Sequence, residues 1–161
     1  MKHRLTALFA SLLMLAAPAF AQQASFTLEQ LKAFAALTPD AFRQQVKARG
    51  FSYVDRTVTD QVSMIEYDKM VDDETVRLMK STYVESRASE NSVELSLTDK
   101  AAFDRLVKEV RAAGYAPAEK GRIPGGETYQ DYKRKTDVVR FVYPRKDSIP
   151  GRPSYTAVVS R

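Results

Sequence analysis

The chain has 161 residues, of which 44% are apolar and 10% aromatic, a composition typical of a folded domain rather than of a disordered protein. It has a formal net charge of +5, contains no cysteine, and has one histidine, His3, near the N-terminus. This composition excludes disulfides and excludes metal sites or nucleophilic catalysis that depend on cysteine.

Residues 1–21 have the pattern of a secretory signal peptide. Two cations precede an apolar run too short to span a bilayer, and Ala19-Phe20-Ala21 offers the small residues that signal peptidase requires. We expect a mature α+β domain over residues 22–161 that is periplasmic or secreted, has no membrane span and has lost His3. Nucleophilic triads that rely on histidine as the base are then also excluded.

Three segments of the mature chain have the apolar spacing of helices, and each follows a residue that can cap a helix. The capping residues are Thr27 with Gln30 for the first helix, Thr38 before Pro39 for the second, and Thr98 or Asp99 for the third. The second and third helices are expected to end at Gly50 and Gly114, because glycine adopts the left-handed conformation that closes a helix.

The rest of the chain has the alternating pattern of strands. Eight strands are expected, near residues 51–53, 62–67, 76–83 and 93–97 and over residues 115–119, 127–135, 137–143 and 154–160. The polar segments Asp68–Glu74 and Ser86–Asn91 are expected to be turns, and two glycine- and proline-rich segments, Gly121–Gly126 and Pro150–Pro153, are expected to be loops.

The two halves of the mature chain share a local match. Val46–Phe51 and Val110–Tyr115 lie 64 positions apart, and both have valine, a basic residue and alanine, then one position that differs, then glycine and an aromatic residue. The match predicts an α+β fold of two tandem helix-plus-four-strand repeats, about 38–98 and 99–161, with the helices packed on one face of an antiparallel sheet. The alternative is that any helix leaving through a glycine into a strand has this pattern.

The order of helix, four strands, helix and four strands in an exported chain is similar to the tandem-repeat architecture of β-lactamase inhibitor proteins. The resemblance covers most of the mature chain as topology, without a shared motif. Those inhibitors rely on disulfides that this chain cannot form, so the resemblance implies a fold and assigns no interface residue. The chain also resembles small exported proteins that have the same step from glycine to an aromatic residue after each helix.

The motifs that carry catalysis are weak. Asp72-Asp73-Glu74 is the densest acidic cluster, but it lies in a predicted turn and lacks the spacing of a calcium loop. Glu66 and Glu94 are expected at outward-facing strand positions, and Lys80 and Ser81 are adjacent on a strand and so point to opposite faces. We therefore expect no catalytic residues, no metal and no cofactor.

The final quarter of the chain is basic, with 10 Lys and Arg against 4 Asp and Glu in residues 120–161. Aromatic and basic residues are interleaved there and form a candidate binding patch: Tyr129, Tyr132, Lys133, Arg134, Lys135 and Arg140, with Arg145, Lys146 and Arg152 nearby. A solvated sheet face is the simpler reading, because Tyr is common in strands and Lys and Arg protect sheet edges.

The leading hypothesis is a non-enzymatic exported protein that acts as a binding or interaction module. Its partner would be an anionic component of the cell envelope or an acidic protein surface, and nucleic acid is not expected. Two alternatives stay open: a hydrolase using Asp/Glu or Lys/Tyr chemistry, and a structural subunit of an envelope assembly.

Overall fold

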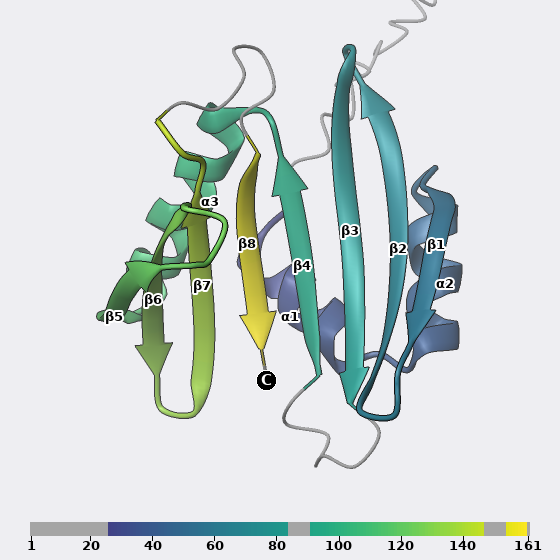
Figure 1. Ribbon diagram of the computed structural model, residues 1–161, viewed down its shortest axis with the longest axis horizontal. Helices are drawn as coiled ribbons and strands as arrows, with labels where there is room; N and C mark the ends of the chain where they lie inside the picture. Colours follow the sequence, from purple (N-terminus) through teal and green to yellow (C-terminus); the bar gives the residue numbers. More distant parts are fainter. Residues whose placement is uncertain (1–25, 84–90, 147–153, 161) are drawn as a thin grey trace, which may run out of the picture.

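The computed structural model describes residues 26–83, 91–146 and 154–160. Within these residues the protein is α+β, with three helices and one eight-stranded antiparallel sheet (Figure 1). The expected signal peptide, the loop at 150–153 with Arg152, and all but the last residue of the turn at 86–91 lie outside the described residues. No helix in the described part is long and apolar enough to cross a membrane.

The three helices form where the capping residues predict them. They are α1 (Leu28–Ala36), α2 (Pro39–Ala48) and α3 (Lys100–Ala112). Thr27 and Gln30 make a reciprocal capping box, with each side chain bonded to the other residue's backbone N–H at 3.2 Å. Asp99, and not Thr98, caps α3, because its Oδ1 accepts the Ala101 N–H at 2.7 Å.

The strands are β1 (Ser52–Val58), β2 (Val62–Val71), β3 (Glu74–Tyr83), β4 (Ser92–Leu97), β5 (Ala116–Arg122), β6 (Thr128–Arg134), β7 (Asp137–Tyr143) and β8 (Tyr155–Ser160). Their order in the sheet is β1-β2-β3-β4-β8-β7-β6-β5, so the two halves meet where β4 pairs with β8. The expected loop at 121–126 is shorter than predicted, because Gly121 and Arg122 continue β5 in register with β6.

The expected turn over Asp68–Glu74 is wrong in extent. The paired strands β2 and β3 continue to Val71 and Glu74, which leaves only Asp72 and Asp73 in the turn. Both have positive φ, 49° and 63°, the conformation that two-residue hairpin turns require and that Asp tolerates.

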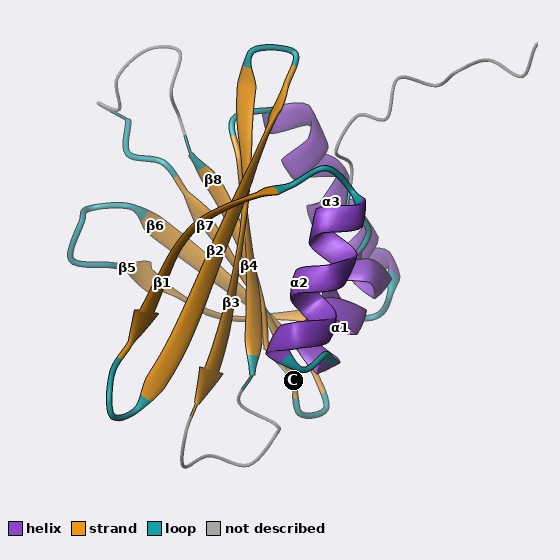
Figure 2. Ribbon diagram, turned by 90° about the vertical axis from the view of Figure 1, so that its right-hand side faces the viewer, coloured by secondary structure: helices purple, strands orange, loops and turns teal. Residues whose placement is uncertain are grey.

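All three helices pack on one face of the sheet (Figure 2). The core between them contains aromatic chains, with Phe42 edge-on to Tyr67 under α2 and Phe103 edge-on to Phe141 under α3. Packing of the helices on one face is confirmed, but the expectation of one helix for each half accounts only for α2 and α3. The additional helix, α1, contacts β4 and β8 and so covers the seam between the halves.

The opposite face of the sheet, which we call the open face, carries no helix of the described residues (Figure 2). Side chains alternate between the two faces along each strand, so the neighbours of buried core residues lie on the open face. Cross-strand pairing aligns one row of them across the sheet: Asp55, Glu66, Met79, Glu94, Val158, Arg140 and Asp131.

Candidate functional site

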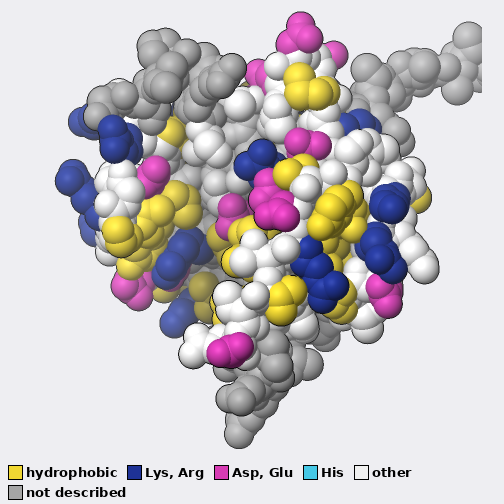
Figure 3. Space-filling model, turned by 45° about the vertical axis from the view of Figure 1, so that its right-hand side comes forward, with side chains coloured by type: hydrophobic (Ala, Val, Ile, Leu, Met, Phe, Trp, Pro, Cys, Tyr) yellow, Lys and Arg dark blue, Asp and Glu magenta, His cyan; other side chains and the backbone are white. Residues whose placement is uncertain are grey.

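A groove of about 640 Å³ lies on the open face over β2, β3 and β4. Its lining includes acidic side chains, thioethers and one guanidinium, among them Glu66, Met70, Arg77, Met79, Glu94 and Leu97. This volume is in the range of small-molecule sites. Figure 3, with the open face turned obliquely to the viewer, shows acidic and basic side chains beside hydrophobic ones on this side of the molecule.

The floor of the groove holds two glutamates in different environments. Glu66 is paired with Arg77, whose Nε lies 2.7 Å from Glu66 Oε1. Glu94 receives one hydrogen bond within the described residues, a long one of 3.4 Å from Ser96 Oγ, which also shares a 3.0 Å bond with Thr156 Oγ1. Burial raises the pKa of Glu94, and the charge of Glu66 adds to the rise while Ser96 and Arg77 oppose it.

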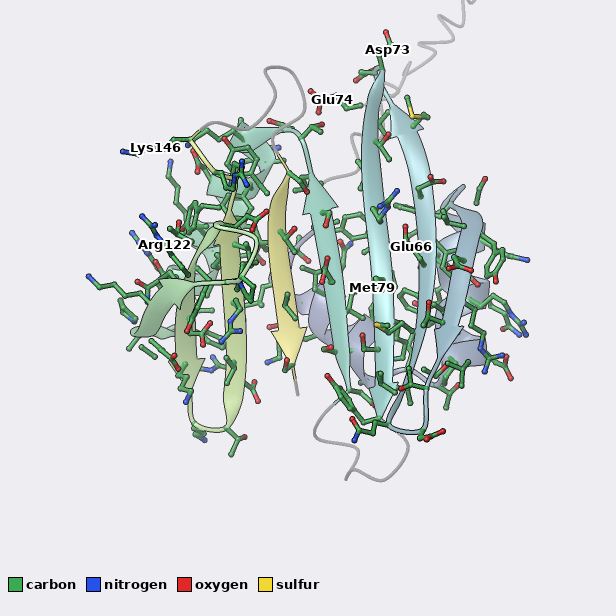
Figure 4. All side chains as sticks on the ribbon, in the orientation of Figure 1. Glu66, Asp73, Glu74, Met79, Arg122 and Lys146 are labelled. Carbon is green, nitrogen blue, oxygen red and sulfur yellow. The ribbon has the colours of Figure 1, made fainter. Side chains whose placement is uncertain are left out.

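The β2–β3 hairpin forms the upper rim of the groove (Figure 4). Thr98 Oγ1 donates a 2.6 Å hydrogen bond to Glu74 Oε2, which ties the hairpin to the end of β4. Thr75 Oγ1 lies 3.3 Å from the sulfur of Met70, which is 63% exposed. In the acidic cluster at 72–74, Asp72 and Asp73 therefore form the turn, and Glu74 makes a contact at the rim of the groove.

The two glutamates are separated by one strand. Glu66 and Glu94 both pair in register with Met79, so their Cα atoms are about 10 Å apart at the usual spacing of about 4.8 Å between strands. Long, flexible side chains allow two carboxylates at that backbone separation to contact one small ligand between them. One acid with a raised pKa beside an ion-paired carboxylate is also the combination that general acid and base catalysis uses.

The six predicted patch residues do not form one surface. Tyr132 is buried on the helix side, and its hydroxyl accepts hydrogen bonds from Arg111 Nε at 3.0 Å and Nη2 at 2.6 Å. Arg134 also turns to that side, where it donates to the Ala113 carbonyl at 2.8 Å and lies over the Tyr115 ring. Both residues secure α3 and its C-terminus.

Three of the remaining patch residues lie on the open face. Arg140 makes a two-pronged ion pair with the buried Asp131, at 2.7 and 2.9 Å, and stacks 4.1 Å from the centroid of the Tyr129 ring. The Tyr129 hydroxyl donates to Glu119 at 2.6 Å. Lys133 is exposed near the end of β6, the strand that also contains Tyr129 and Asp131.

The other cations lie at turns and at the outer edge. Lys135 occupies the β6–β7 turn with a φ of 56°. Arg145 donates to the Gly125 carbonyl at 3.3 Å, and Lys146 lies beyond β7 on the same side as Arg122 (Figure 4). The arginines of the patch are thus bonded within the protein, although Arg134 is exposed, as Lys133 and Lys135 are.

Lys80 and Ser81 lie on opposite faces, as expected. Lys80 is 1% exposed and faces the helices, where its Nζ donates to the carbonyls of Phe34 at 3.2 Å and Ala35 at 2.9 Å. Burial lowers the pKa of Lys80 to about 8. Its bonds to main-chain carbonyls, on the face opposite the groove, make it a structural residue.

Sequence reasoning placed Glu66 and Glu94 on outward-facing positions but did not bring them together. The alternation along each strand was a sufficient signal for their face, whereas their proximity depends on the pairing of β2 and β4 with β3. Within the described residues, no three His, Cys, Asp or Glu side chains are grouped so that they could hold a metal ion. Comparison of the chain with protein-family models, curated proteins and solved structures found no match.

Proposed function

We propose that this chain is an exported, non-enzymatic binding protein whose ligand site is on the open face of the sheet. The observation that supports this proposal most directly is the groove over β2–β4 on a face that the described helices leave uncovered. Export rests on the signal-peptide pattern of residues 1–21, and N-terminal sequencing of the protein from the periplasm or medium should begin at Gln22.

The open face has two ends of different character. The groove end carries glutamates and thioethers, and the β6–β7 end carries the Arg140–Asp131 pair with exposed Lys133. A partner that binds the groove is therefore distinguishable from an anionic partner that binds the basic end. This difference allows one experiment to separate the two surfaces.

The experiment measures retention of components of a native envelope extract by immobilised protein, with bound molecules identified by mass spectrometry. Met79→Arg places a long cation in the middle of the groove, and Lys133→Glu with Lys135→Glu reverses the exposed basic end. We expect Met79→Arg to abolish retention and the double variant to retain the ligand, with both variants keeping the wild-type circular dichroism spectrum. Wild-type retention by both variants would exclude the open face as the binding surface.

A hydrolase is the second candidate, because the groove gathers two carboxylates in unlike environments. Glu94 would act as the general acid and Glu66 as the base or nucleophile. The test is release of nitrophenol from a panel of aryl glycosides and aryl esters. This candidate requires turnover above buffer that falls at least about 100-fold in Glu94→Gln, and the absence of turnover would reject it.

We also infer that residues 38–98 and 99–161 derive from one duplicated unit. The strand order reads 1-2-3-4 from one edge and 5-6-7-8 from the other. Equivalent contacts support the inference, since Lys69 Nζ donates to the Arg49 carbonyl at 3.0 Å and Arg134 Nη1 to the Ala113 carbonyl at 2.8 Å, each at the end of a helix. The duplication would explain how two similar halves present one continuous face.

A further inference from the structure

The charge of the groove is opposite to the charge of the chain. Of the described residues that line the groove, four are carboxylates (Glu66, Asp73, Glu74 and Glu94) and one is a guanidinium, that of Arg77. Arg77 is already engaged by Glu66, at 2.7 Å. The chain as a whole has a net charge of +5, so the groove is a local concentration of negative charge on a basic protein.

Glu94 has hydrogen-bond acceptor sites that no protein donor fills within the described residues. A carboxylate has about four acceptor sites, and within the described residues Glu94 receives one hydrogen bond, at 3.4 Å from Ser96 Oγ. The Ser96 hydroxyl is shared with Thr156. The remaining acceptor sites of this carboxylate are therefore open to a cationic donor placed in the groove.

Between the two glutamates the groove is apolar. Met79 lies in register between Glu66 and Glu94, and the exposed Met70 adds further apolar surface to the lining. Thioether side chains are flexible and polarisable, so they adapt to apolar ligands of different shape. The same surface therefore offers carboxylates to a cation and thioethers to a hydrocarbon.

We propose that the groove binds a small organic cation, an ammonium or guanidinium group attached to an apolar body, with the cation bonded to Glu94 and the body against Met79. The proposal rests on the proposed function and names the class of ligand. The acidic lining of the groove complements a cation, and its volume of about 640 Å³ suits a molecule of this size.

The test uses n-hexylammonium as the probe and the protein labelled with ¹³C at its methionine methyl groups. We expect titration to shift the Met79 and Met70 methyl signals at millimolar probe and the affinity to fall with added salt. Hexanoate, which has the same chain and the opposite charge, and ammonium chloride, which has no apolar body, should leave both signals in place at the same concentrations. A similar response to hexanoate would overturn the proposal.

Two matched variants locate the cation. Glu94→Gln removes one charge within the groove and is expected to weaken n-hexylammonium binding about tenfold, which is 1.4 kcal/mol. Glu29→Gln makes the same change in the exposed first turn of α1 and should leave binding unchanged. Wild-type affinity in Glu94→Gln would overturn the assignment.

Failure of the organic-cation proposal can be distinguished from failure of the proposed function. If Met79→Arg abolishes retention of the natural ligand but n-hexylammonium leaves the methionine signals unchanged, the open face is the binding surface and the ligand is not a small organic cation. If Met79→Arg and the Lys133→Glu/Lys135→Glu double variant both leave retention of the natural ligand intact, the proposed function itself is wrong.

Discussion

At the scale of single residues, Lys80 shows how the core tolerates a buried charge. Its ammonium group donates hydrogen bonds to two backbone carbonyls in the last turn of α1, a turn that contains no basic residue of its own. The negative end of a helix dipole favours a cation, and Lys80 supplies that cation from β3. The cost is desolvation, which lowers its pKa to about 8.

The pKa of Lys80 predicts a pH dependence of stability. Between pH 8 and 10.5 the native state has lost the Lys80 proton while the unfolded state still holds it. The free energy of unfolding therefore increases as the pH rises through this range. Relative to Lys80→Met, the wild type should gain about 3 kcal/mol across this window in urea unfolding experiments. Lys133→Met, at an exposed position, serves as the control and should follow the wild type. A constant difference between wild type and Lys80→Met would contradict the prediction.

The Asp131–Arg140 ion pair predicts that substitution of Arg140 lowers the free energy of unfolding more than substitution of Lys133. Arg140→Gln leaves the Asp131 carboxylate, whose side chain is 6% exposed, without its partner, and should lower the free energy of unfolding by about 2 kcal/mol. Lys133→Gln should change it by less than about 0.5 kcal/mol. Adding Asp131→Asn to Arg140→Gln should restore part of the loss. Equal effects of the two single variants would show that the pair has no structural role.

At the scale of elements, α2 and α3 end in the same way. After α2 and α3 the chain passes through Gly50 and Gly114, with φ of 82° and 83°, and then buries Phe51 and Tyr115 in the core. The Phe51 N–H bonds to the Val46 carbonyl and the Tyr115 N–H to the Val110 carbonyl. The glycine therefore reverses the chain so that an aromatic residue anchors the start of the following strand.

Alanine at either glycine should destabilise the protein through the backbone alone. A Cβ at Gly50 or Gly114 meets no atom closer than 3.6 Å or 3.9 Å, so the cost is that of a left-handed conformation, about 1–2 kcal/mol. Gly50→Ala and Gly114→Ala should therefore show similar shifts in urea midpoint, and asparagine at each site a smaller one. Strongly unequal losses would argue against duplicated units.

At the scale of the whole molecule, α1 joins the two halves. The Leu28 N–H donates to Glu109 of α3 at 3.0 Å, and Lys32 forms a 3.1 Å ion pair with Asp137 of β7. Phe34 and Ala35 receive the Lys80 ammonium group from β3. One helix therefore has bonds to elements of both halves, in addition to the backbone pairing of β4 with β8.

These bonds predict that the two halves unfold together. Calorimetry should give a single transition whose calorimetric and van't Hoff enthalpies agree. Chemical denaturation followed by near-ultraviolet and far-ultraviolet circular dichroism should give coincident curves. Two resolved transitions would mean that the seam under α1 is not a cooperative interface.

The candidate site was accessible from the sequence only in part. The alternation of β2 and β4 indicates that Glu66 and Glu94 face outward, but no local pattern states that β3 lies between these strands. The basic patch was predicted from residue types within 129–140, and alternation divides these residues between two faces. Tyr132 belongs to the core because its neighbours in space are Arg111 and Phe141.

The sequence by itself determined the local elements, because caps, glycines and hydrophobic periodicity act over a few residues. Thr27, Thr38 and Asp99 start helices at the expected positions, and alternation locates the strands. Only the tertiary structure decided that α1 covers the β4–β8 seam and that Glu66, Met79 and Glu94 lie side by side. Strand order and helix placement minimise exposed apolar surface over the entire chain, and this long-range balance is not encoded in any single segment.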